Sequence, residues 1–93
     1  MDSYWRERYR RDLSGILCRI DDPKIMAAFL DDLLTPAELD DIIVRWQIVR
    51  QLDKKKTQRE VAENLGISIA KVTRGARELS DNKGGFRQIL SKE

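Results

Sequence analysis

The residues best suited to chemistry in this sequence are short side chains, hydroxyls and bases within residues 69–74. They are Ile69, Ala70, Lys71, Thr73 and Arg74. Side chains of these types on one helix suit the major groove of DNA, where they can contact base edges and phosphates. Gln58 and Arg59 stand near the start of a preceding helix, where Gln58 suits a backbone contact and Arg59 can hold guanine through two hydrogen bonds. The pattern predicts a DNA-binding surface formed by these seven residues.

Two short helices joined by a tight turn must position these side chains, and residues 57–78 encode such a unit. Thr57 and Glu60 have the spacing of a capping box, which starts a helix. Gly66 stands where that helix should end, because only glycine adopts a left-handed backbone at no steric cost. Ser68 can then cap the second helix. The segment therefore predicts a helix-turn-helix.

The remaining chain is also predicted to be helical, which gives an all-α fold of six helices. Asp22 and Thr35 are good helix caps, and each precedes a proline that suits the first helical position. Glu38 completes a capping box with Thr35. Outside the helix-turn-helix, the expected helices cover Ser3–Ile20, Pro23–Leu33, Pro36–Lys54 and a last one within residues 84–93.

The third predicted helix is apolar on nearly all sides, and this bears on domain organisation. A helix of this kind must be buried nearly all round, and a 93-residue monomer has little material to cover it. A homodimer with an interdigitated core is expected, with a central helix of a monomeric bundle as the alternative. We expect one helical domain over residues 1–93, with dimer-core helices in 1–54 and a helix in 84–93 that completes the dimer core.

Charge is segregated along the chain, although the net charge is only +2. Residues 45–77 carry nine bases and three acids, whereas residues 21–44 carry one base and seven acids. The positive charge coincides with the predicted helix-turn-helix, as a phosphate-binding surface requires. The acidic segment is expected to face away from DNA.

Several function classes are disfavoured by the composition. The chain has no histidine, and its single cysteine, Cys18, cannot build a zinc site or an internal disulfide. No nucleophile has a base beside it, so an enzyme is not expected, nor a metal or bound cofactor. No apolar run approaches the ~20 residues of a membrane span, and Trp5–Arg11 is too charged for a signal peptide. A cytoplasmic protein is expected.

The segment from Leu33 to Leu79 resembles the bacterial Trp repressor family. The register is kept except for one residue fewer in the linker near Lys55 and Lys56, and the terminal segments match mainly in helix pattern. The triplet Thr73-Arg74-Gly75 is the most specific element, because an ordinary helix-turn-helix does not require it. The other matching blocks are Leu33-Leu34-Thr35-Pro36, Arg45, Ile48-Val49, Gln58-Arg59-Glu60, Leu65-Gly66 and Ile69-Ala70.

This resemblance implies an intertwined, all-helical homodimer that represses transcription by binding a palindromic DNA operator once L-tryptophan is bound as corepressor. Arg45 and Arg74 match the two arginines that flank the ligand's indole, and planar guanidinium groups do stack on aromatic faces. Thr35 matches the residue near the ligand's carboxylate and amino groups. Gly75 matches the position where the backbone lies close to the ligand.

Glu78 departs from the family pattern, which usually has a serine there that helps to hold the ligand's ammonium. A carboxylate could hold that ammonium more strongly, could pair with Arg74 four residues earlier, or could simply fill space. The ligand can therefore be tryptophan or a different amino acid or indole derivative. A ligand-independent regulator and a protein-interaction module of the transcription machinery remain the alternative functions.

Overall fold

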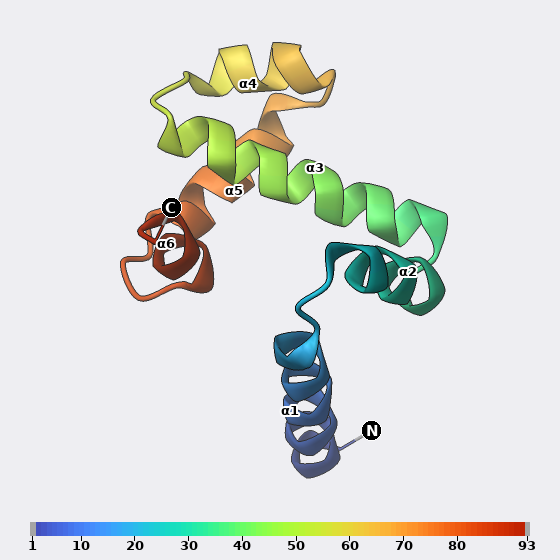
Figure 1. Ribbon diagram of the computed structural model, residues 1–93. Helices are drawn as coiled ribbons and strands as arrows, with labels where there is room; N and C mark the ends of the chain where they lie inside the picture. Colours follow the sequence, from blue (N-terminus) through green and yellow to red (C-terminus); the bar gives the residue numbers. More distant parts are fainter. Residues whose placement is uncertain (1, 93) are drawn as a thin grey trace. The chain divides into compact units, whose positions relative to one another are not determined.

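The computed structural model describes residues 2–92, and within them it contains six α-helices and no strand (Figure 1). The predicted all-α class is confirmed. The predicted helix ends agree closely with those observed, and the last helix lies within residues 84–93 as expected. The helices are α1 (Ser3–Arg19), α2 (Pro23–Leu33), α3 (Pro36–Asp53), α4 (Gln58–Leu65), α5 (Ile69–Leu79) and α6 (Gly85–Leu90).

The caps expected from the sequence form as predicted around α4 and α5. The Thr57 hydroxyl accepts the Glu60 backbone N–H at 3.1 Å, and the Glu60 carboxylate accepts the Thr57 backbone N–H at 3.3 Å. Gly66 ends α4 with φ 65°, the left-handed conformation that favours glycine. The Ser68 hydroxyl accepts the Lys71 backbone N–H at 3.4 Å and so begins α5. Local hydrogen bonds therefore set both ends of the turn.

The helices fall into two compact units, with the division after Leu39 near the start of α3. In the first unit, α1 and α2 contain no buried side chain. Leu13 and Ile16 of α1 are each 41% exposed, although both have large apolar side chains. Trp5 stacks on Tyr9 with ring centroids 5.7 Å apart. Large apolar side chains of this unit thus remain exposed.

The second unit holds α4, α5, α6 and the greater part of α3, and it contains the buried core. Two clusters form this core. The α3 helix contributes Ile48 to the first cluster and its neighbour Val49 to the second. An ion pair of 3.0 Å between Arg87 and Asp53 joins α6 to the end of α3. The first cluster is Ile48, Val61 and Val72, and the second is Val49, Leu79 and Leu90.

The chain covers only part of the apolar surface of α3. Ile48 and Val49 are its buried residues, while Ile42 and Ile43 remain 42% and 52% exposed. Trp46 is half-buried and packs against the second cluster, with its ring centroid 6.2 Å from that of Phe86. Within residues 2–92, no helix has both the length and the apolar character needed to cross a membrane.

Candidate functional site

The α5 helix has one buried face and one exposed face. Val72, Gly75 and Leu79 are buried at spacings of three and four residues, which is one side of a helix. The exposed residues of the first two turns are those that the sequence assigns to DNA contact: Ile69, Ala70, Lys71, Thr73 and Arg74. The structure therefore leaves these five side chains accessible on a helix whose other face is anchored in the core.

Gln58 and Thr73 contact each other across the two motif helices. The Thr73 hydroxyl lies 2.8 Å from the Gln58 side-chain oxygen and 3.0 Å from the Ile69 carbonyl oxygen, and it can donate to either acceptor. This contact fixes α4 against α5, while the amide NH₂ of Gln58 can still donate outward. Arg59 is exposed beside it. Gln58 thus holds α4 against α5 and keeps its amide donor available.

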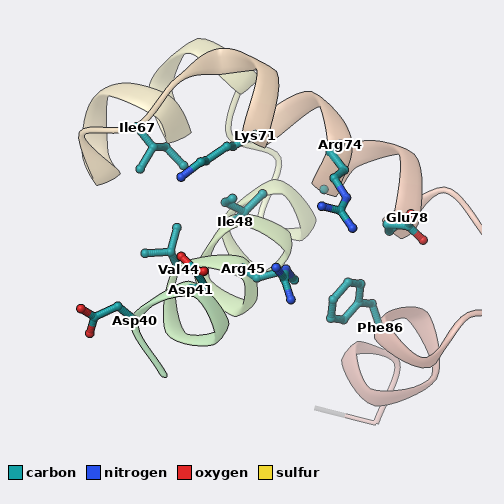
Figure 2. Close-up of a pocket in the computed structure, with 11 residues that line it drawn as sticks. Asp40, Asp41, Val44, Arg45, Ile48, Ile67, Lys71, Arg74, Glu78 and Phe86 are labelled. Carbon is teal, nitrogen blue, oxygen red and sulfur yellow. The ribbon is translucent and has the colours of Figure 1, made fainter. Parts of the chain in front are cut away.

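A pocket of about 490 Å³ lies between α3 and α5, with Phe86 of α6 at one side (Figure 2). Its volume falls in the range of pockets that hold small molecules. Its apolar lining comes from Val44, Ile48, Ile67, Gly75 and Phe86, and its charged lining comes from Asp40, Asp41, Arg45, Lys71, Arg74 and Glu78. The sequence-predicted ligand residues Arg45, Arg74, Gly75 and Glu78 therefore meet in one pocket.

Regular helix spacing explains this charged lining. On α3, Asp41, Arg45 and Ile48 follow one another at intervals of four and three residues, so they share a face. On α5, Lys71, Arg74 and Glu78 do the same. Three bases and three acids thus surround one space, which suits a ligand that carries both charges.

Arg74 and Glu78 both line the pocket, and their side chains do not form an ion pair with each other. Among the described residues, the ion pairs are Arg10 with Glu7 and Arg87 with Asp53, and neither Arg74 nor Glu78 takes part in one. Pairing of Glu78 with Arg74 was one of three roles that the sequence left open, and the structure does not show it. Both groups are therefore available to a ligand.

Gly75 is required by helix packing as well as by the pocket. A Cβ atom at this position would lie 2.5 Å from Cγ2 of Ile48, which is only 4% exposed. The absence of a side chain lets α5 approach α3 closely. A substituent there would first meet the core residue Ile48, a contact that the sequence did not reveal.

Thr35 belongs to the first unit, whereas the residues that line the pocket belong to the second. Its hydroxyl accepts the Glu38 backbone N–H at 3.2 Å, and its own backbone N–H donates to the Glu38 carboxylate at 2.9 Å. Thr35 thus caps α3, as predicted from the capping box.

The Thr35 cap should be measurable in the titration of Glu38. Hydrogen bonds from the backbone and then the side chain of Thr35 lower the pKa of Glu38 from its ordinary value. The stability that these hydrogen bonds give to the folded protein is fully present when the pH is above the ordinary pKa of Glu38. It is lost as the pH falls through the lowered pKa. We expect Thr35→Ala to raise the Glu38 pKa, as followed by carboxyl NMR, and Thr35→Ser to leave it low. An unchanged pKa in Thr35→Ala would contradict this.

Three charged residues of the pocket and one aromatic residue were not assigned to it by sequence reasoning. Lys71 was assigned to DNA alone, and Asp40 and Asp41 were counted in an acidic segment expected to face away from DNA. The helical spacing between Asp41 and Arg45 is a signal that could have placed Asp41. Phe86 offers no such signal, because a loop separates it from α5.

Comparison with known proteins identifies the family. The family model described as Trp repressor protein matches residues 11–93. This chain belongs to the Trp repressor family. A Trp operon repressor homolog of Xylella fastidiosa is 44% identical over 89 residues, which are 95% of this chain and 95% of that protein. One of Chlamydia trachomatis is 41% identical over 70 residues, 70% of this chain and 74% of its own length.

Other relatives and the family's general role agree with this assignment. A Trp operon repressor homolog of Mannheimia succiniciproducens is 48% identical over 61 residues, which cover 64% of this chain and 60% of that protein. No solved structure gives a significant match to this chain. Members of the Trp repressor family are transcription regulators and not enzymes, so the chain is a transcriptional repressor by family.

Proposed function

We propose that this repressor binds a palindromic operator in double-stranded DNA as a homodimer, and that a small amino acid, L-tryptophan or a relative, controls this binding. The observation that carries the proposal is that α5 serves two surfaces. Its exposed residues form the candidate DNA face, and Lys71, Arg74, Gly75 and Glu78 of the same helix line the pocket. A ligand in that pocket would contact the helix that meets DNA. Such a regulator would act in the cytoplasm, where bacterial DNA lies.

On the DNA side, the proposed contacts fall into two groups. Ile69, Ala70, Lys71 and Thr73 would enter the major groove, with Arg59 and Arg74 contacting guanine edges or phosphates. Gln58 would donate to the DNA backbone. Helix-turn-helix dimers, the Trp repressors among them, place their reading helices one turn of DNA apart, about 34 Å. A palindromic operator follows from such a two-fold arrangement.

On the ligand side, the proposed roles follow the charges in the pocket. Arg45 and Arg74 would flank an aromatic ring, and Arg74 could also meet a carboxylate. Glu78 would accept the ligand's ammonium, since it is not paired within the described chain. Gly75 keeps the backbone of α5 close to the pocket. Thr35, which the family resemblance places near the ligand's polar groups, completes the proposed set.

Support for the homodimer comes from apolar surface that the chain leaves exposed. The core of the described residues holds six buried hydrophobic side chains, all of them in the second unit. Leu13, Ile16, Ile42 and Ile43 are each more than 40% exposed. Burial of these side chains against a partner chain would remove apolar surface from water and so favour association. We propose that a second copy covers them, with residues 1–54 and 84–93 forming the shared core around the helix-turn-helix at 57–78.

Two measurements test the proposal. Calorimetry with L-tryptophan and other amino acids should give heat with a subset of them. Fluorescence anisotropy with duplexes selected from a random pool should then show tighter DNA binding in the presence of an amino acid from that subset. DNA binding must also weaken steeply with salt, because lysines and arginines displace counterions from phosphate. No duplex binding at low salt would refute the DNA-binding role and favour a protein-interaction module. Duplex binding unaffected by every amino acid would indicate a ligand-independent regulator.

A further inference from the structure

The helices α3 and α4 are followed by the same backbone turn, but a different residue occupies its key position. After α4, the Gly66 N–H donates to the carbonyl oxygen of Glu63 at 3.3 Å, and the next N–H donates five residues back at 3.1 Å. After α3, the Lys55 N–H donates to the carbonyl oxygen of Leu52 at 3.0 Å, and the next N–H donates five residues back at 3.4 Å. This pair of hydrogen bonds closes a helix end around one residue in the left-handed conformation.

Lys55 adopts this left-handed conformation although it is not glycine. Its φ is 71°, close to the 65° of Gly66, and no other non-glycine residue in the part of the chain that the structure describes has a positive φ. A Cβ atom disfavours this conformation because it crowds the following carbonyl oxygen, and glycine has no Cβ. Glycine would therefore suit position 55 better than lysine does. Residues held in such conformations concentrate at functional sites.

The charge of Lys55 is not needed to stabilise the end of α3. Cations favour a helix C-terminus because the last carbonyl oxygens lack partners. Lys54 and Lys56 stand on either side of Lys55 and already provide this charge. The Lys55 side chain is exposed, and neither ion pair within residues 2–92 includes its ammonium. The ammonium is thus available to a partner outside the chain.

The place of Lys55 in the chain points to DNA phosphate as that partner. Lys55 lies three residues before Gln58, whose side chain contacts Thr73 of the candidate DNA face at 2.8 Å. Three residues span at most about 11 Å, and the flexible four-carbon stem of lysine adds to this reach. Duplex DNA carries one phosphate charge per about 1.7 Å of its axis. Phosphates should therefore lie within reach of Lys55 when α5 occupies the groove.

We infer that Lys55 contacts the DNA backbone, and that this contact accounts for a lysine at a position where glycine would be more stable. The inference rests on the proposed DNA binding and adds a contact outside the seven residues assigned to it from the sequence. Because phosphate contacts carry no sequence information, Lys55 should contribute to affinity for every duplex and not to the choice between operators.

The test compares Lys55→Gly with Lys55→Gln in the full-length protein, using a mixed-sequence duplex with and without L-tryptophan. Both variants lose the charge, so both should bind the duplex several-fold more weakly, with a salt slope smaller by about one unit per protomer. Only Lys55→Gly also relieves the backbone, so it alone should raise the melting temperature, by a few degrees at fixed protein concentration. Fluorescence anisotropy at several salt concentrations and thermal unfolding measure these two effects.

Lys24→Gln is the matched control, because it removes the same charge from an exposed position on α2 within the acidic segment 21–44. It should leave DNA affinity close to that of the wild type, and Lys55→Arg, which keeps the charge, should keep the salt slope. Equal weakening in Lys24→Gln would show a general charge effect and overturn the inference. A Lys55→Gly variant no more stable than the wild type would also overturn it, since glycine would then have no advantage at this position.

Failure of the inference can be separated from failure of the proposed function. If the wild-type protein does not bind the duplex even at low salt, the DNA-binding role itself is wrong. If the wild type binds DNA and both uncharged Lys55 variants bind with the same affinity and salt slope, the proposed function stands and only the role of Lys55 is wrong.

Discussion

Arg74→Ala is expected to weaken the binding of both the amino-acid ligand and DNA. Arg74 lines the pocket and is exposed on the candidate DNA face, so its guanidinium can serve both partners. Loss of a charge-assisted hydrogen bond costs about 1.5–3 kcal/mol, which corresponds to a rise in ligand Kd of at least tenfold. The salt slope of DNA binding should fall by about one unit. Calorimetry and anisotropy measure the two effects separately.

Arg77→Ala is the matched control for this prediction. It removes the same charge from the same helix, but Arg77 does not line the pocket. Ligand affinity should therefore stay close to that of the wild type. Arg45→Ala should weaken ligand binding as Arg74→Ala does, without the loss in salt slope. If Arg74→Ala and Arg77→Ala gave the same ligand affinity, Arg74 would have no role in the pocket.

Gly75→Ala is expected to lower the free energy of unfolding and to weaken ligand binding. The added Cβ would meet Ile48 Cγ2 at 2.5 Å, and Ile48 is held in the core cluster with Val61 and Val72. Overpacking of this kind costs about 1–3 kcal/mol, and the better helix propensity of alanine offsets at most about 1 kcal/mol. With the full offset, urea unfolding at fixed protein concentration should therefore show a net loss of up to about 2 kcal/mol.

The ligand effect of Gly75→Ala follows from the same contact. To relieve the overlap, α5 must move away from α3, and these helices form the two walls of the pocket. Gly85→Ala is the control, because a Cβ there has nothing within 4 Å. It should unfold at a urea concentration close to that of the wild type. A Gly75→Ala variant as stable as the wild type would mean that the core adjusts around Ile48.

Much of the fold follows from short-range features of the sequence. Capping residues such as Thr57 and Ser68 place helix starts within one or two residues, and Gly66 places the turn. These features act through hydrogen bonds that span only a few residues, so the sequence alone defines them. The family resemblance identified Arg45, Arg74, Gly75 and Glu78, and the structure brings these four into one pocket.

By itself, then, the sequence determined six helices, the helix-turn-helix and the basic character of residues 45–77. The tertiary structure alone decided that Asp40, Asp41 and Phe86 join Lys71 at the pocket, and that Gly75 packs against Ile48. The physical reason is the range of the interactions. Helix periodicity determines which residues share a face, but only the crossing of packed helices determines which faces meet.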